Sequence, residues 1–232
     1  MALQIEHLEA YRGRFRVYVQ RLEVNSVVVI LGRNGSGKTT LLDAVAGFLK
    51  ARGRVVACGR DVSQLPPHKR GLAYVQAVPI DPPGRVDKFL RAVARLHSTE
   101  DQVGEVVEAL GIKHLLGRSG GLSTGQKQLV NLAAALLAKP CAFLMDEPTS
   151  HLDWINKKAF NDVVKKLGVA TLYVTHDPFE AMYIADTLCV MENGTLQTCM
   201  KNNARPEETY RLAESLWHNY RGQKNLKTDM NM

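Results

Sequence analysis

The chain of 232 residues is long enough for one large domain, or for one domain with an inserted lobe. Its hydrophobic content of 45% is ordinary for a globular protein, and no stretch approaches the roughly 20 consecutive apolar residues that a membrane-spanning helix requires, so we expect a chain that does not cross a bilayer. The net charge of +7 is compatible with nucleic acid, an anionic membrane surface or a polyphosphate ligand, and equally with a generally basic surface, so it selects none of them.

The start of the chain has no basic region followed by an apolar core, so we expect no secretory signal. The cysteines, Cys58, Cys141, Cys189 and Cys199, show no close pairing in the sequence. We expect all four to be reduced packing residues of a cytosolic protein.

The N-terminal region is predicted to form two half-exposed strands, because apolar and polar residues alternate over 3–10 and 15–19. A turn around Gly13 separates them, and Tyr11 lies at that turn. An aromatic ring there can stack on an adenine, although taken alone Tyr11 would be an ordinary surface tyrosine. A further short strand is expected over 54–59.

A phosphate-loop pattern follows, Gly32-Arg33-Asn34-Gly35-Ser36-Gly37-Lys38-Thr39, with two glycines five residues apart before Lys and Thr. The β-branched run 27–31 precedes it, and 40–49 carries apolar residues at helical spacing. The loop therefore joins a buried strand to a helix, which is the context that this pattern requires. A glycine-rich turn that matches by accident is the alternative, and the flanking strand and helix argue against it.

The chemistry of this loop follows from its residue types. Gly35 and Gly37 lack a Cβ, so the backbone can turn and approach a phosphate closely. The free N–H groups at the helix start present the positive end of the helix dipole. Lys38 would reach the β- and γ-phosphates, and the Thr39 hydroxyl would hold Mg²⁺.

The pattern of residues changes after the Pro- and Gly-containing segment 81–84: from 86 to 116, apolar residues recur at helical spacing. We expect an inserted α-helical lobe over about 84–138. Its last part contains Leu122-Ser123-Thr124-Gly125-Gln126 and then a long apolar-periodic helix, with Ser123 as the expected cap.

Two strand ends in the second half carry polar side chains. Strand 142–147 ends in Asp146 and Glu147, and strand 170–175 leads to His176. The carboxyl ends of buried strands are where open α/β sheets place ligand chemistry. A solvated loop is the alternative for the carboxylates, and a structural role for the histidine. A hairpin over 187–199 and a short helix around 206–220 complete the prediction.

Taken together, these pieces resemble the ATP-binding cassette (ABC) ATPases over about 3–197, and the segment 122–126 looks like that family's signature motif with Thr124 in place of the usual Gly. The resemblance implies an α/β fold: a phosphate-loop NTPase core with a mixed and partly parallel sheet, an N-terminal antiparallel β subdomain and the inserted helical lobe. It implies an ABC ATPase domain over 1–200 and a C-terminal helical tail over 201–232.

The resemblance also implies ATP and Mg²⁺ as ligands, and a role for each matching residue. Glu147 would orient or deprotonate the attacking water, while His176 and Lys38 would contact the γ-phosphate. The metal would be held by Thr39, Asp146 and Gln76. The nucleotide-binding residues would be Tyr11, Asn34, Gly35, Ser36, Gly37, Lys38, Thr39 and Thr40. Those facing the ATP of a partner subunit would be Ser123, Gly125 and Gln126.

Two positions depart from the family pattern. Relatives place a magnesium-sensing glutamine seven residues after the arginine that corresponds to Arg70, and this position is Ala77. Either Gln76 serves in a loop shifted by one residue, which we favour, or this ligand is missing. The signature helix also has three alanines at 133–135 where relatives often carry an arginine, a difference that argues little.

The resemblance implies a subunit that dimerises head to tail on ATP, as a homodimer or with a related cassette. It would drive solute transport, with import favoured by the resemblance of 66–75 to importers, through integral membrane permease subunits that dock near Gln76. We expect an extracytoplasmic solute-binding protein in the same system, a peripheral location on the cytoplasmic face of the cell membrane, and no nucleic acid. A non-transport ABC ATPase, such as an iron–sulfur assembly factor, is the alternative. An ATP-binding module without turnover would require the loss of Glu147 or Lys38.

Overall fold

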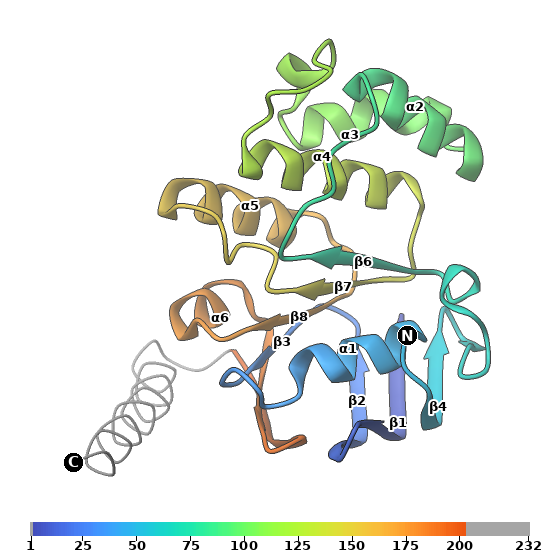
Figure 1. Cartoon of the computed structure of the whole chain (residues 1–232), viewed down its shortest axis with the longest axis vertical. Coiled ribbons are helices and arrows are strands. Elements are labelled where there is room, and N and C mark those ends of the chain that lie inside the picture. The colour runs from blue at the N-terminus through green and yellow to red at the C-terminus, as the bar shows by residue number, and fades with distance from the viewer. Residues whose placement is uncertain (1, 203–232) are drawn as a thin grey trace.

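The computed structural model describes residues 2–202 as a single ten-stranded sheet with helices on both faces (Figure 1). The strands are β1 (Leu3–Arg12), β2 (Phe15–Val24), β3 (Val27–Leu31), β4 (Ala51–Ala57), β5 (Arg60–Asp61), β6 (Leu72–Gln76), β7 (Ala142–Asp146), β8 (Thr171–Thr175), β9 (Thr187–Glu192) and β10 (Thr195–Lys201). The helices are α1 (Lys38–Ala46), α2 (Val86–His97), α3 (Val103–Ala109), α4 (Thr124–Leu137), α5 (Trp154–Lys166) and α6 (Pro178–Ile184). The predicted helix around 206–220 lies outside the described residues.

The sheet has a parallel and an antiparallel half, in the order β5-β4-β1-β2-β10-β9-β3-β8-β7-β6. Strands β3, β6, β7, β8 and β9 pair in parallel, and β3 and β8 are buried along their whole length. Strands β1, β2, β4 and β5 pair antiparallel, and the burial of β1 alternates along its length. The sheet curls so that α1 lies between the two halves (Figure 1). The expected fold class, a mixed α/β fold, is confirmed.

Each face of the sheet has its own hydrophobic core. On one face, Leu41, Leu42 and Val45 of α1 are fully buried against apolar side chains from both halves of the sheet. Burying one such side chain stabilises the fold by about 1.5–3 kcal/mol, so α1 holds the two halves of the sheet together. On the other face, α2 to α6 pack over the parallel strands, with Phe143 and Tyr173 among the largest buried side chains.

Helices α2, α3 and α4 follow β6 and precede β7 in the chain, and they form one compact group (Figure 1). Leu90 and Ala94 of α2 are fully buried in the core that also contains Val130 and Leu137 of α4. The Thr99 hydroxyl donates to the backbone oxygen of Leu137 at 2.8 Å, which joins the end of α2 to the end of α4. The group therefore packs directly on the sheet and shares its core.

The expectation of reduced cysteines was wrong. The structure contains two disulfides, Cys58–Cys141 and Cys189–Cys199, and no free cysteine among the described residues. Cys58 follows β4 and Cys141 precedes β7, so curling of the sheet brings together two residues that are 83 positions apart, with Cα atoms 5.5 Å from each other. Cys189 and Cys199 face each other across β9 and β10.

Within residues 2–202, none of the helices has the length and apolar character needed to cross a membrane. The strand predicted over 3–10 continues to Arg12, and the strand predicted over 15–19 continues to Val24. The tight turn between them is thereby reduced to Gly13 and Arg14, which changes the position of Tyr11, as described below.

Candidate nucleotide site

The phosphate loop joins β3 to α1 with two glycines in the left-handed region, Gly35 at φ 82° and Gly37 at φ 108°. A side chain at Gly37 would come within 2.9 Å of Val17 Cγ2 and 3.0 Å of Phe15 Cε1, so the loop packs directly against β2. Only glycine combines this φ with this close approach. The first N–H groups of α1 have no helical partner and are available for an anion. The Ser36 hydroxyl is likewise buried, and no residue within 2–202 makes a hydrogen bond to it.

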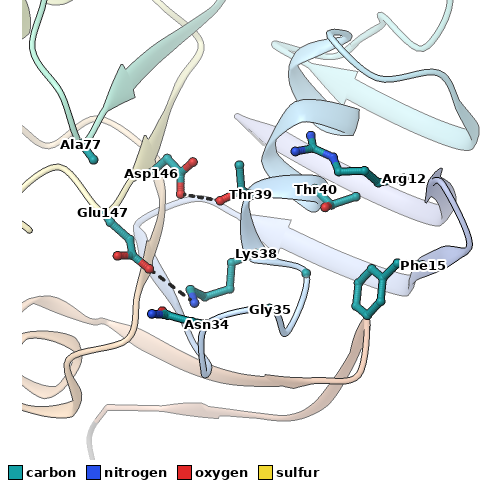
Figure 2. Close-up of a pocket in the computed structure, with 11 residues that line it drawn as sticks. Arg12, Phe15, Asn34, Gly35, Lys38, Thr39, Thr40, Ala77, Asp146 and Glu147 are labelled. Atoms are coloured by element: carbon teal, nitrogen blue, oxygen red, sulfur yellow. Dashed lines mark hydrogen bonds and ion pairs between the residues drawn. The ribbon is translucent and has the colours of Figure 1, made fainter.

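Lys38 is almost fully buried at the start of α1. Its Nζ donates to the backbone oxygens of Gly32 at 2.8 Å and Arg33 at 3.1 Å, and lies 3.4 Å from Glu147 Oε1 (Figure 2). Burial lowers the pKa of Lys38, and the Glu147 charge opposes this shift. The lysine therefore connects the loop to the carboxylate across the cleft.

The Thr39 hydroxyl and the Asp146 carboxylate lie together beside Lys38, where the phosphate loop faces the end of β7. Thr39 Oγ1 donates to Asp146 Oδ1 at 3.1 Å (Figure 2). The Tyr74 hydroxyl donates to the second Asp146 oxygen at 3.3 Å. Burial raises the pKa of Asp146. No group of three His, Cys, Asp or Glu within residues 2–202 could hold a metal ion by itself. A hydroxyl and a carboxylate do fit Mg²⁺ bound to a nucleotide, because Mg²⁺ takes one or two protein oxygens together with substrate phosphates.

Glu147 lies where β7 ends, at φ 46°, a left-handed conformation that is costly for a residue with a side chain. Its N–H donates to Val174 O at 3.0 Å, and its Oε2 lies 2.8 Å from His176 Nδ1. Because β7 and β8 are parallel neighbours, residues that follow them emerge side by side. The sheet thus places the carboxylate between a lysine and a histidine.

A cleft of about 570 Å³ lies over these groups. The residues that line it come from the β1–β2 hairpin, the phosphate loop and the ends of β6 and β7: Arg12, Phe15, Asn34, Gly35, Gly37, Lys38, Thr39, Thr40, Ala77, Asp146 and Glu147 (Figure 2). The structure therefore brings together most of the residues predicted for the nucleotide and the metal.

Tyr11 does not line this cleft. Successive residues of a strand face opposite sides, and Tyr11 is exposed on the side away from buried Ala10, where its hydroxyl donates to Glu9 at 3.0 Å. Arg12 and Phe15 face the cleft instead, at paired positions of the hairpin. Sequence reasoning missed both, although extending the alternation of β1 by two residues would have found Arg12.

Gln76 and Ala77 occupy different places at the end of β6. Ala77 lines the cleft, whereas Gln76 is exposed and lines, together with Ala77, an adjoining hollow of about 320 Å³. This hollow also reaches Thr39 and Asp146. Gln76 thus lies near the two metal-binding candidates without a hydrogen bond to either, and its metal role stays a prediction.

The signature residues lie at the start of α4 and do not line the cleft of their own chain. Ser123 Oγ accepts from the N–H of Gln126 at 3.2 Å, and Gln126 Oε1 accepts from the N–H of Ser123 at 3.0 Å, a reciprocal cap. A side chain at Gly125 would lie 3.2 Å from Asn156 of α5, so a glycine allows these helices to approach.

A glycine-rich loop, a buried lysine at a helix start and two carboxylates at a strand end define a phosphate-loop nucleotide hydrolase. Residues 19–150 match the family model described as ABC transporter. The chain belongs to this family and is an ATPase of the transport class.

Relatives and solved structures agree with this membership. The chain is 38% identical to a molybdate/tungstate import ATP-binding protein of Archaeoglobus fulgidus, over 79% of this chain and 81% of that protein. It is 37% identical to an sn-glycerol-3-phosphate import ATP-binding protein of Rhizobium johnstonii, over 82% of this chain and 53% of that protein. The crystal structure of an ATP-binding cassette of an ABC transporter in its ADP conformation superimposes with a TM-score of 0.81, at 25% identity, covering 95% of this chain and 98% of that one.

Proposed function

We propose that this chain is the ATP-hydrolysing subunit of an importer, that it dimerises head to tail on ATP, and that it drives separate membrane subunits. One observation carries the proposal: the signature segment lies outside the cleft of its own chain, while Lys38 and Glu147 line that cleft and His176 contacts Glu147. Each chain therefore presents one half of a site and one complementary surface. The import names of the relatives favour transport over iron–sulfur assembly.

In the proposed reaction, the phosphate loop and Lys38 bind the β- and γ-phosphates through N–H groups and a buried charge. The Phe15 ring, which lies against Gly37, stacks on the base in place of Tyr11. Glu147 orients the attacking water and accepts its proton, while His176 fixes the Glu147 carboxylate from the other side. Thr39 and Asp146 would hold Mg²⁺, which neutralises phosphate charge when bound.

The dimer follows from the half-sites. The N-terminus of α4 presents the N–H groups that its cap does not use, and the positive end of the dipole of a fourteen-residue helix, which suits the γ-phosphate bound by a second copy. Ser123, Gly125 and Gln126 would complete that copy's site, and the loop that ends at Asp153, the cap of α5, would also contact that copy. Binding of ATP then joins the two chains, and hydrolysis releases them.

The permease is proposed to dock over the hollow beside Gln76. Phe48 lines this hollow with Val78, and Ile80 follows in the same segment; each is more than three-fifths exposed, which is unusual for side chains of this kind. An apolar partner segment would cover them. Docking there would place the chain on the cytoplasmic face of the membrane, with a solute-binding protein on the other side. The import names of the relatives support this arrangement.

The first test is Glu147→Gln. We expect ATP binding to persist and turnover to fall by about a hundredfold or more, because an amide cannot accept the proton of the attacking water. Mg-ATP should then trap a dimer, measured by light scattering after gel filtration. Glu105→Gln, at an exposed position of α3, is the control and should behave as the parent protein. Unchanged hydrolysis would remove Glu147 from the mechanism, and a strict monomer in saturating Mg-ATP would overturn the shared site.

A further inference from the structure

Gln128 on α4 is fully buried and connects two loops at the edge of the cleft. Its Nε2 donates to the backbone oxygen of Gln76 at 2.7 Å and to that of Pro148 at 2.6 Å. Gln76 ends β6, and Pro148 directly follows Glu147. A single side-chain amide therefore ties the helical group to the segment on which the proposed catalytic carboxylate lies.

The backbone cannot supply these contacts itself. The ladder between β6 and β7 ends with the pair Gln76 and Asp146, so both carbonyl oxygens lie at or beyond the last pair of residues. Pro148 has no N–H, which removes one donor from this turn. Carbonyl groups shielded from water need a partner, and the Gln128 amide provides one for the buried oxygen of Pro148 and one for the partly buried oxygen of Gln76.

The carboxylate is thus fixed from two sides. The N–H of Glu147 donates to Val174 O on β8, and the carbonyl of the next residue accepts from Gln128 on α4. The left-handed φ of Glu147 lies between these two attachments, which restrain the backbone on either side of it. If α4 moved relative to the sheet, this contact would break or would carry the Glu147 segment with it.

We propose that Gln128 is a positioning residue for hydrolysis, one that sets the place of Glu147 and couples it to the position of α4. The proposal rests on the proposed role of Glu147. The Gln128 side chain is not explained by packing alone. Its Oε1 is buried and has no hydrogen-bond partner among the described residues, which is costly for a side chain that only fills space.

The test is Gln128→Met, which keeps the length of the side chain, removes both donors and also removes the unsatisfied oxygen. We expect kcat to fall by about tenfold or more while KM for ATP changes by less than about threefold, because the phosphate loop is untouched and only the carboxylate is displaced. Gln128→Glu, which places an acceptor against two carbonyl oxygens, should reduce kcat further. A parent-like kcat in the Met variant would overturn the proposal.

Asn131→Ala is the matched control. Asn131 lies one turn further along α4, and its amide donates to Ile80 O at 2.9 Å, so this variant loses a similar bond from the same helix without touching the Glu147 segment. Its kcat should stay within about twofold of the parent value. An equal loss in both variants would mean that general attachment of α4, and not Gln128, sets the rate.

Glu147→Gln is measured in parallel, so that the two hypotheses fail separately. An inactive Glu147→Gln beside a parent-like Gln128→Met would overturn only the positioning role, whereas an active Glu147→Gln would overturn the proposed site itself. Folding is checked by thermal unfolding and by binding of a non-hydrolysable ATP analogue. Should the Met variant not fold, Gln128→Asn replaces it, since its amide is one methylene too short to reach both oxygens; lowered kcat supports the proposal and parent-like kcat overturns it.

Discussion

Phe15 and Tyr11 are close in sequence, yet they face opposite sides of the β1–β2 hairpin, and this difference decides which of them can touch a nucleotide. Phe15 lines the cleft and lies against Gly37 of the phosphate loop. Tyr11 is exposed on the other face, where its hydroxyl donates to Glu9. A base bound above the phosphate loop can therefore stack on Phe15 and is out of reach of Tyr11.

We predict that Phe15→Ala weakens ATP binding while Tyr11→Ala does not. Loss of one base–aromatic stack costs about 1–3 kcal/mol, which corresponds to roughly 5- to 150-fold in Kd. Titration with a fluorescent ATP analogue measures both variants. Phe15→Trp should retain the parent affinity. The outcome that would contradict this assignment is a larger loss in the tyrosine variant than in the phenylalanine variant.

The residues of the phosphate loop could be predicted because their chemistry is local. Lys38 and Thr39 are the first residues of α1, so the adjoining glycine-rich turn is enough to determine where they lie. The face on which Tyr11 lies depended on where β1 ends, and a strand end is set by pairing with β2 over nine positions. Because the predicted strand stopped at residue 10, the sequence pattern placed Tyr11 in the turn and did not pair Arg12 with Phe15.

At the scale of the element, α1 ends against a buried arginine. Arg70 Nη1 donates to Val45 O at 2.8 Å and Ala44 O at 3.3 Å, while Nε and Nη2 donate to Leu65 O and Ser63 O, both at 2.8 Å. Burial lowers the pKa of this guanidinium. A positive charge at the helix C-terminus complements the helix dipole, and it gives Val45 O a donor beyond the end of the helix. Gly47 makes room for it, because a Cβ there would lie 2.4 Å from Arg70 Nε.

We predict that Arg70→Met destabilises the fold by about 3 kcal/mol, because it leaves buried carbonyl oxygens without a donor. For a chain of this size the loss corresponds to a Tm lower by about 6–12 °C, which scanning calorimetry measures. Arg60→Met, at an exposed position of β5, is the control and should change the stability by no more than about 0.5 kcal/mol. A Tm within 2 °C of the parent in Arg70→Met, roughly 1 kcal/mol, would show that water replaces the arginine.

The elements themselves were accessible from the sequence where periodicity is strong. Strand β7 ends at Asp146, one residue before the predicted end at Glu147, and the reciprocal cap at Ser123 matches the expected helix start. The contribution of Gln128 was not accessible in this way. Its two acceptors are backbone oxygens of residues 52 and 20 positions away, and a sequence pattern contains no information about which carbonyl groups the ends of strands leave unpaired.

For the whole molecule, the order of the strands in the sheet determines which cysteines are paired, and this pairing could not be predicted from the sequence. Spacing gave no reason to pair Cys58 with Cys141, because their contact requires β4 and β7 to lie on opposite sides of α1 with the curled sheet joining them. Cys189 and Cys199 oppose each other only in the register that β9 and β10 adopt. The antiparallel and parallel halves are thus joined covalently as well as through α1.

We predict that reduction lowers the Tm, and that most of the loss comes from Cys58–Cys141. In the chain-entropy model, closing a loop over the separation of 83 residues stabilises the fold by about 4.5 kcal/mol, against about 2.7 kcal/mol for the separation of 10 residues in Cys189–Cys199. Cys58→Ser with Cys141→Ser should therefore lower the Tm by about 9–18 °C, and the matched pair Cys189→Ser with Cys199→Ser by roughly half as much. Scanning calorimetry with and without dithiothreitol measures this, and mass spectrometry after alkylation of the native protein should find no labelled cysteine. Four labelled cysteines in the oxidised protein, or equal effects of the two double variants, would contradict the prediction, since the longer loop restricts the unfolded chain more.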